Sequence, residues 1–227
     1  AHNQPTHMST ASVESTGVRV QYRTSQERRK DWECMKLRRA TLADITDLVR
    51  VCNLAYRGGD EVTGWTGEEH LLIGNRTSKE QLEPLLKDTD NHIFLAVDDI
   101  STEKPTLVGF CHVQTLTGEE TKAEVGMLSV KPSEQSRGIG SLLMREALRI
   151  CREDLHRDTA VMWILDGRVD LLGWYHKLGF VDTGRIEPFP DISTRVGVPR
   201  EEIVGTHTLF FHVLEKSLVE AKTATDQ

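Results

Sequence analysis

The sequence lacks the long apolar runs and the leader pattern that would direct a chain into or across a membrane. No apolar stretch approaches the ~20 residues that a membrane-spanning helix needs. The N-terminal region also lacks the succession of basic, apolar and small residues that marks a secretory signal. Hydrophobic residues make up 38% of the chain and charged residues 28%, which is typical of a soluble globular protein. We therefore expect a cytoplasmic protein with no membrane partner.

Cysteine is scarce, and its spacing excludes the common metal sites. The four cysteines are Cys34, Cys52, Cys111 and Cys151. They form no C-x-x-C pair, and no histidine lies at ligand spacing from them. We expect free thiols in a reducing compartment and no bound metal.

Positive charge is also in short supply. The chain has 28 Lys and Arg against 35 Asp and Glu, a formal net charge of −7 at pH 7. Nucleic acids are polyanions that bind basic surfaces, so this excess of acidic residues argues against a nucleic-acid partner. It suits the steering of a cationic small molecule, although for most proteins such a charge reflects solubility alone.

Hydrophobic periodicity predicts one α/β domain between residues 35 and 217. A largely flexible tail at 1–34, with a short strand at 18–22 as an alternative, and a frayed end at 218–227 flank it. We expect strands at 35–39, 92–97, 106–115, 123–130, 160–165, 180–185 and 206–214, and helices at 41–56, 68–73, 79–87, 139–154 and 169–178. The three consecutive strands before residue 131, with a turn at Gly118, predict an antiparallel meander within a mixed sheet.

The most informative stretch runs from residue 124 to 150. An apolar strand leads through a turn to Q-S-R-G-I-G at residues 135–140, and an amphipathic helix follows. The first N–H groups of a helix lack internal partners and lie at the positive end of its dipole. Glycine lets a ligand approach that backbone closely. An anion such as a phosphate is therefore favoured at this turn, with Arg137 as an additional charged donor.

Two common phosphate-binding fingerprints are absent from this turn. Gly140 is followed by Ser141 rather than by the Lys of GxxxxGK[ST], and Leu143 stands where GxGxxG needs its last glycine. The motif that is present, Q-x-R-G-x-G after a strand ending in L-S-V, resembles the acyl-CoA-binding signature (Q/R)-x-x-G-x-(G/A). That signature belongs to the GNAT superfamily of N-acetyltransferases.

Two further stretches support the resemblance to the GNAT superfamily. Residues 174–180, W-Y-H-K-L-G-F, are similar to the F-Y-x-x-x-G-F ending of the family's second conserved helix. The E-P-F-P at 187–190, followed by G-V-P-R at 197–200, resembles a loop in a group of small GNAT proteins. The resemblance covers roughly residues 35–215. It implies a GNAT-type mixed, mostly antiparallel central sheet flanked by helices.

The resemblance also implies acetyl-CoA as cosubstrate and assigns residues to it. Strand residues would offer backbone groups to the pantetheine arm as an added strand would, and the glycine-rich turn would cradle the pyrophosphate. Tyr175 would protonate or hydrogen-bond the departing thiolate. The family often has Asn seven residues before this tyrosine, where this chain has Arg168, so no such contact is transferred. The implied binding residues are Leu128, Ser129, Val130, Gln135, Ser136, Arg137, Gly138, Ile139, Gly140, Ser141 and Tyr175.

Acyl transfer to an amine also needs a base, for which Glu124 is the first candidate and His112 the second. Glu124 shares a strand face with Gly126 and Leu128 under strict alternation. His112, on the preceding strand, has an ordinary pKa near the operating pH. A structural role is the plainer explanation for each.

The acceptor side of the site has weaker candidates. Tyr56 and Trp65 could form its wall, and Glu187 and Asp191 could hold a cationic acceptor. Packing aromatics and exposed loop charges are the plainer explanations.

Together these features predict an acetyl-CoA-dependent N-acetyltransferase that works by direct attack in a ternary complex. The acceptor is expected to be a primary amine of a small molecule, cationic in solution. The alternatives are a protein or peptide acetyltransferase for Lys or N-terminal amines, and a non-catalytic CoA-binding module. The oligomeric state stays open, with a homodimer among the options.

Overall fold

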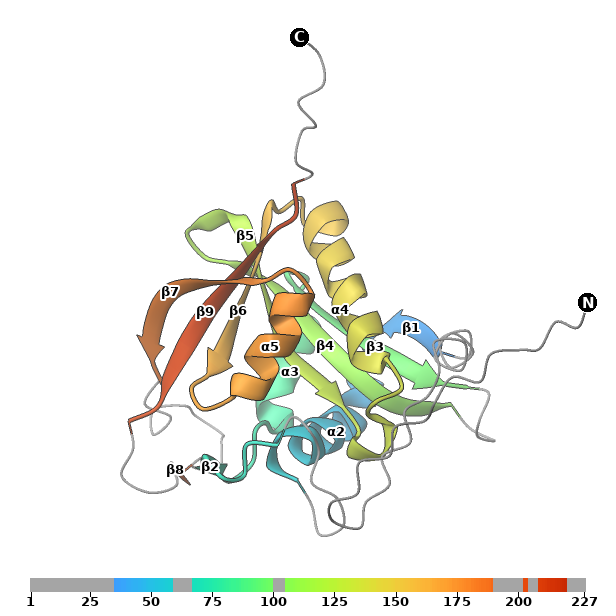
Figure 1. The fold of residues 1–227 in the computed structure, drawn as a ribbon. Coiled ribbons are helices and arrows are strands. Elements are labelled where there is room, and N and C mark those ends of the chain that lie inside the picture. The colour runs from blue at the N-terminus through green and yellow to red at the C-terminus, as the bar shows by residue number, and fades with distance from the viewer. Residues whose placement is uncertain (1–34, 59–66, 100–104, 190–201, 204–207, 220–227) are drawn as a thin grey trace, which may run out of the picture.

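The fold is built on one seven-stranded sheet (Figure 1). The structure is a computed structural model that describes residues 35–58, 67–99, 105–189, 202–203 and 208–219. In sheet order the strands are β1 (Met35–Arg39), β3 (Asn91–Asp98), β4 (Thr106–Leu116), β5 (Glu119–Val130), β6 (Thr159–Leu165), β9 (Phe210–Ser217) and β7 (Val181–Pro188). Neighbouring strands are antiparallel except β5 and β6, which are parallel. The predicted mixed, mostly antiparallel sheet is confirmed.

Helices cover both faces of the sheet (Figure 1). One face packs against α2 (Ile45–Arg57) and α3 (Lys79–Lys87), and the other against α4 (Ile139–Arg149) and α5 (Val169–Lys177). In α2 the buried side chains recur at the three- and four-residue spacing of a helix face: Leu48, Val51, Cys52 and Ala55. Capping boxes begin the short η1 (Leu42–Asp44) and α3, formed by Thr41 with Asp44 and by Ser78 with Gln81. None of the described helices is long and apolar enough to cross a membrane.

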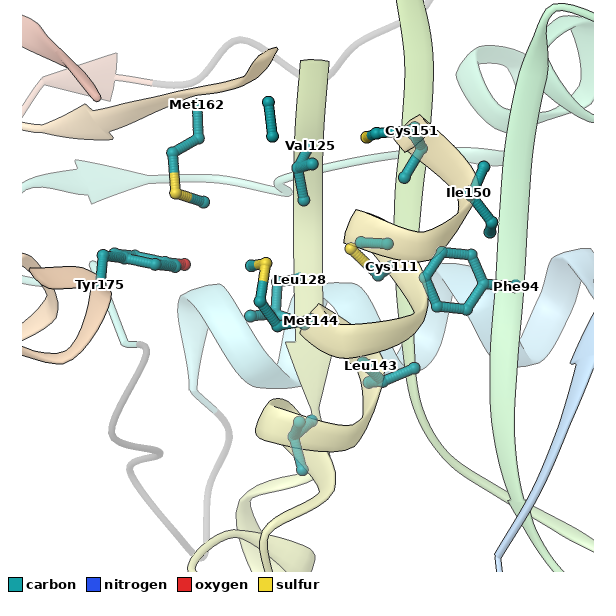
Figure 2. Packing of buried hydrophobic residues seen from close by; sticks show 14 of the residues in the cluster. Phe94, Cys111, Val125, Leu128, Leu143, Met144, Ile150, Cys151, Met162 and Tyr175 are labelled. Atoms are coloured by element: carbon teal, nitrogen blue, oxygen red, sulfur yellow. The ribbon is translucent and has the colours of Figure 1, made fainter. Parts of the chain in front are cut away.

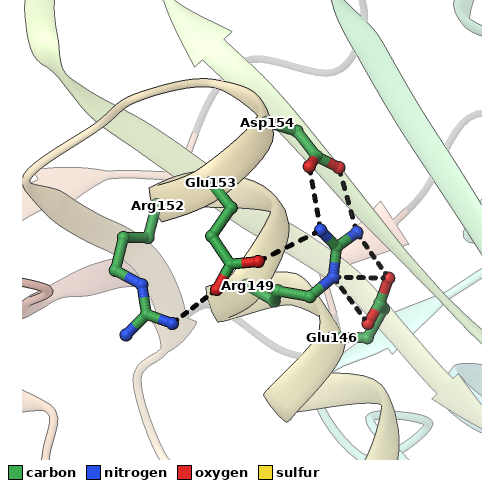
Figure 3. Close-up of polar contacts among 5 residues, drawn as sticks. All are labelled: Glu146, Arg149, Arg152, Glu153 and Asp154. Carbon is green, nitrogen blue, oxygen red and sulfur yellow. Dashed lines mark hydrogen bonds and ion pairs between the residues drawn. The ribbon is translucent and has the colours of Figure 1, made fainter.

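The far end of α4 continues into η3 (Ile150–Asp154), a π-helical turn (Figure 3). Arg149 donates to both carboxylate oxygens of Asp154 at 2.8 and 3.0 Å and also to Glu146. Arg152 pairs with Glu153 at 2.6 Å. Exposed ion pairs are individually weak, but a network around one guanidinium holds the end of the helix better than an isolated pair. The opposite, N-terminal end of α4 carries the glycine-rich turn.

The two central strands separate at the middle of the molecule. β5 pairs with β6 at Lys122, Ala123 and Glu124, and the described strands have no pairing beyond that point. On its other edge β5 carries a bulge. Phe110 of β4 pairs with Ser129 and His112 pairs with Gly126, so β5 has one residue more than β4 between the two pairs. Met127 in this bulge has a φ of 50°. The separation leaves backbone polar groups of β5 without a strand partner on the β6 side, where a ligand can bond them.

Two of the predicted elements are wrong in type or position. Residues 68–73 form a turn and the two-residue strand β2 (Leu72–Ile73), which pairs with β8 (Glu202–Ile203), instead of a helix. Tertiary contacts hold this segment: Glu68 forms a buried ion pair with Arg57, and Leu72 packs in one cluster with Leu165 and Leu209. The last strand runs over 210–217 rather than 206–214. The strand alternative at 18–22, Trp65, Asp191 and the G-V-P-R stretch lie outside the described residues.

Candidate active site

The glycine-rich turn at the start of α4 opens into a cavity of about 370 Å³, called the first cavity here. Gly138 is the N-cap of α4 with a φ of 81°, and Ser136 has a φ of 64°. These left-handed conformations let the chain turn sharply into the first turn of α4. The cavity is lined by Leu128, Val130, Gln135, Ser136, Gly138, Ile139, Gly140, Ser141, Leu171, Trp174 and Tyr175. The structure thus brings the predicted binding residues together, apart from Ser129 and Arg137.

Ser129 and Arg137 point elsewhere. Ser129 is fully buried, and its hydroxyl donates to the carbonyl of Met127 at 3.0 Å. The guanidinium of Arg137 pairs with Glu134, and it lies 3.7 Å from the carboxylate of Asp98. These carboxylates hold the Arg137 side chain in its observed direction, and neither residue is among those that line the cavity. Their part in binding a donor stays a prediction.

Gly140 faces the first cavity. A Cβ added there would lie 3.7 Å from Cζ2 of Trp174 and 3.9 Å from Cγ2 of Val130, which are ordinary contact distances. Both neighbours line the cavity. Packing within the protein therefore does not demand glycine at this position, whereas close approach of a ligand to the backbone does.

Two backbone carbonyls on the free edge of β5 already accept hydrogen bonds from side chains. The hydroxyl of Tyr56 donates to the carbonyl of Leu128 at 3.2 Å. The side-chain amide of Gln135 donates to the carbonyl of Val130 at 3.2 Å. Leu128 and Val130 are the strand residues that were predicted to meet a pantetheine arm. The bonds from Tyr56 and Gln135 show that their carbonyls are accessible to donors from outside the sheet.

A second cavity, of about 230 Å³, lies where β5 and β6 separate. It is lined by Tyr56, Arg57, Glu68, Leu72, Arg76, Glu124, Val125, Gly126, Met127, Leu128, Met162, Trp163, Ile164, Leu165, Leu171, Tyr175, Phe189 and Phe211. It shares Leu128, Leu171 and Tyr175 with the first cavity. The two cavities therefore meet at these three side chains.

Tyr175 stands at this junction, and its hydroxyl points toward Leu128 on β5 (Figure 2). The residue is 5% exposed, and its ring packs edge-on against Trp174 and Phe180. Burial raises the pKa of its hydroxyl, and the nearby Cys111 thiol adds to the effect. The phenol consequently stays protonated at neutral pH and is able to donate a hydrogen bond or a proton.

Glu124 lies on the wall of the second cavity. Its carboxylate accepts a hydrogen bond from the side-chain amide of Gln114 at 2.5 Å. Burial raises the pKa of the carboxyl, while the Gln114 bond and the positive charge of Arg76 oppose the rise. A carboxylate with a raised pKa is a stronger base than an exposed one.

His112 does not reach either cavity. It is 5% exposed, and its Nε2 lies 2.7 Å from Oδ1 of Asn91. Burial, helped by the charges of His92 and Arg76, lowers the pKa of the imidazole to about 4. The ring is therefore neutral at pH 7, and its Nε2 is engaged within the protein. This geometry favours Glu124 over His112 among the two candidate bases.

A buried ion-pair network that the sequence did not indicate supports the second cavity. Arg57 pairs with Glu68 at 2.9 Å, and Arg168 lies 3.9 Å from the same carboxylate. Arg168 is 3% exposed and also pairs with Asp170 at 3.0 Å. Arg57, Glu68 and Arg168 are far apart in the sequence and belong to no motif. The sequence alone therefore could not indicate that they lie together.

Of the two acceptor-side candidates within the described residues, only Tyr56 lines the second cavity. Tyr56 lines the second cavity, with the guanidinium of Arg76 5.3 Å from its ring centroid. Glu187 accepts from the indole of Trp163 at 3.0 Å and pairs with Arg185. It is not among the lining residues of either cavity.

The Acetyltransferase (GNAT) family profile matches residues 59–180, and the chain belongs to this family. Mycothiol acetyltransferase of Mycobacterium leprae strain Br4923 is 29% identical over 142 residues, covering 60% of this chain and 43% of that protein. The corresponding protein of Tsukamurella paurometabola is 30% identical over 146 residues, covering 63% and 47%. The chain thus spans less than half the length of these relatives.

Solved structures share the fold. yncA from Salmonella typhimurium, solved with its cofactor acetyl-CoA, has a TM-score of 0.57 at 17% identity and covers 82% of this chain and 95% of its own. A spermidine/spermine N-acetyltransferase from Vibrio cholerae has the same score, identity and coverages. The acetyl donor of the family is acetyl-CoA.

Proposed function

We propose that this protein is an acetyl-CoA-dependent N-acetyltransferase that acetylates a primary amine of a small molecule by direct attack in a ternary complex. The observation that carries the proposal is the meeting of two cavities at Tyr175 and Leu128. A thioester bound in one cavity and an amine bound in the other would place their reacting atoms at the same point.

The first cavity suits the donor. The N-terminus of α4 and the backbone of residues 135–141 offer N–H groups to a pyrophosphate, and Gly140 leaves the space for its approach. The edge of β5 beside the separation from β6 offers further backbone groups to the pantetheine arm. Residues of the turn, the end of β5 and Tyr175 all line this cavity.

The second cavity suits the amine. Glu124 accepts a proton from the ammonium group, directly or through a water molecule, which generates the nucleophile. The nitrogen attacks the thioester carbonyl carbon and the C–N bond forms. The C–S bond then breaks, and the extra proton on the nitrogen passes to the thiolate, directly or by way of the Tyr175 hydroxyl. The hydroxyl of Tyr175 hydrogen-bonds or protonates the departing thiolate. A thiol with an ordinary pKa near ~8.5 is a fair leaving group, so no covalent enzyme intermediate is needed.

A small-molecule acceptor is consistent with the second cavity, which measures about 230 Å³ and is lined by side chains of α2, β5 and β6 among others. The names of two of the similar proteins, mycothiol acetyltransferase and spermidine/spermine N-acetyltransferase, also refer to small molecules.

The test combines a binding and a turnover measurement. Acetyl-CoA at 100 times its Kd should stabilise the protein by about 2.7 kcal/mol and raise its melting temperature. A free-thiol assay across a panel of primary amines should then find amine-dependent release of CoA. Stabilisation without turnover for any amine or peptide would favour a binding module, and the absence of stabilisation would overturn the assignment of the first cavity.

A further inference from the structure

The proposed base, Glu124, is held by one side chain of the neighbouring strand. Glu124 of β5 and Gln114 of β4 are directly paired in the sheet, so their side chains lie on the same face. The side-chain amide of Gln114 donates to Oε2 of Glu124 at 2.5 Å. A hydrogen bond to a charged carboxylate is stronger than one between neutral groups, and it fixes the direction of the carboxylate.

The other oxygen of Glu124 has a different environment. Among the described residues, Oε1 has no hydrogen-bond partner. A Cβ added to Gly126 would lie 3.3 Å from this oxygen, so the carboxylate leans along β5 over Gly126. Glu124, Gly126 and Leu128 line the second cavity, and Leu128 also lines the first. Oε1 is therefore directed along β5 toward the residue where the two cavities meet.

The absence of a side chain at Gly126 keeps this oxygen open. Gly126 does not have a positive φ, so its backbone conformation does not demand glycine. The described atoms nearest to an added Cβ are Oε1 and Cδ of Glu124, at 3.3 and 4.0 Å. A side chain at this position would thus crowd the carboxylate on the side that faces along the cavity wall.

Glu124 shares its surroundings with other ionisable groups. Those that line the same cavity are Tyr56, Arg57, Glu68, Arg76 and Tyr175. Arg57 and Glu68 pair with each other at 2.9 Å, and burial raises the pKa of both phenols, so these stay neutral at pH 7. Outside the cavity, the low pKa of His112 on β4 leaves it neutral at pH 7, and Lys122 on β5 pairs with Glu215 at 3.0 Å.

Gln114 also influences the ionisation of Glu124. Burial raises the pKa of the Glu124 carboxyl. The Gln114 bond is the larger of two effects that oppose this rise, and the charge of Arg76 is the smaller. A hydrogen bond to the charged form stabilises that form. Loss of the bond should therefore raise the pKa further, so that the carboxyl ionises only at higher pH.

We infer that Gln114 is a positioning residue for the acetyl transfer: it holds Oε2 of Glu124, so that Oε1, over Gly126, receives the proton of the ammonium group. This inference rests on the proposed function. The proton passes from nitrogen to Oε1, its bonding pair stays on the nitrogen as the lone pair that attacks, and Oε1 later releases the proton to solvent. Gln114 acts through Glu124 and touches no reacting atom.

Gln114→Met removes the donor and keeps a side chain of similar length. The test measures kcat/KM across pH for the amine with the highest turnover. On the pH-independent plateau we expect a fall of about 10- to 100-fold, since a base misplaced by the order of 1 Å can cost that much. The acidic limb of the profile should also move to higher pH, because the carboxylate loses the bond that stabilises it.

A second substitution separates positioning from general stability. In a Glu124→Gln background no base remains to be positioned, so adding Gln114→Met should change kcat/KM by less than about threefold. Thr115→Val is the matched control. Thr115 is the next residue on β4, points to the opposite face of the sheet and lines neither cavity. This control should leave both the plateau and the acidic limb as in the wild type.

Gly126→Ala tests the choice of oxygen. The added methyl group would crowd Oε1, so kcat/KM should fall by about 10-fold or more while acetyl-CoA still raises the melting temperature. In the Glu124→Gln background the same change should cost less than about threefold. An equal loss in both backgrounds would mean that the methyl group merely obstructs the amine, which would contradict the assignment of Oε1.

The outcomes distinguish this inference from the proposed function. An unchanged plateau and limb in Gln114→Met, or an equal loss with and without Glu124, would overturn the inference and leave the proposed function standing. If a melting curve shows that Gln114→Met does not fold, Gln114→Asn, whose amide is one methylene shorter, is measured against the same expectations. No turnover of any amine, with acetyl-CoA still raising the melting temperature, would overturn the proposed function and the inference with it.

Discussion

The two cavities differ in how their lining residues are distributed along the sequence. The first is made from consecutive residues, the turn 135–141, together with one helix and one strand end. The second collects residues from α2, the segment before α3, β5, β6, α5, β9 and the chain after β7. A donor shared by a whole family needs one fixed backbone cradle, whereas an acceptor cavity is assembled from scattered positions that are able to change independently. The contrast predicts that changes in the first cavity abolish binding of the donor, while changes in the second alter chemistry and specificity.

The largest effect is expected from Gly140→Asp. The carboxylate would enter the first cavity, where it clashes with and repels a pyrophosphate, so the Kd for acetyl-CoA should rise by at least about 1,000-fold, or roughly 4 kcal/mol. Calorimetry measures it. Gly140 is a cleaner target than Gly138, whose φ of 81° would strain any side chain.

Gly173→Asp is the matched control for this change. Gly173 lies on α5, and a Cβ there meets nothing within 4 Å. The control should bind acetyl-CoA as the wild type does. Unchanged affinity in Gly140→Asp would contradict the phosphate-cradle assignment.

The next largest effect is expected from Glu124→Gln. This change should lower kcat/KM for the amine by about 100- to 1,000-fold, within the range that general-base catalysis contributes. Binding of acetyl-CoA should not change, which a melting curve with the ligand verifies. The wild-type activity should fall as the pH drops through the raised pKa of Glu124, because the protonated acid cannot accept a proton. The variant should lose this acidic limb and depend on the amine's own ionisation. A retained limb would assign it to another group.

Tyr175→Phe should lower kcat by about 10- to 100-fold with little change in the KM for acetyl-CoA, because the hydroxyl acts on the departing thiolate and not on binding. A single-turnover measurement keeps product release from hiding the effect. An unaltered single-turnover rate would remove Tyr175 from the proposed role.

The smallest effect is expected from His112→Gln. The imidazole lies outside both cavities, so kcat/KM should change by less than about threefold, within the effect of a remote packing change. Loss of the Asn91 hydrogen bond should lower the free energy of unfolding by about 1 kcal/mol, which denaturant titration can detect. A fall in kcat/KM as large as that of Glu124→Gln would reinstate His112 as the base.

The first cavity could be predicted because its signals are local. A strand, a glycine turn and a helix follow one another in the chain, and Gly138 and Gly140 mark where the backbone must stay open. The periodicity of apolar residues likewise placed α2 and α4 within a few residues of their observed bounds. The direction of the Arg137 side chain has no such local signal, because it pairs with Glu134 and lies near the distant Asp98.

The second cavity could not be predicted to the same degree because it depends on tertiary contacts. The positive φ of Met127 in the bulge of β5 has no composition signal. The place of Arg76 on the wall of this cavity has no local signal either. The low pKa of His112 follows from burial, which a strand pattern does not quantify.

The most direct test of the central claim is an initial-velocity study in which acetyl-CoA and an amine are both varied, with free thiol and N-acetylated product measured together. We predict amine-dependent thiol release in equal amount with the acetylated amine, and double-reciprocal lines that intersect, as a ternary complex requires. Parallel lines would contradict direct attack, since they report an acetylated enzyme formed before the amine binds. Thiol release that does not depend on the amine would contradict the pairing of the two cavities.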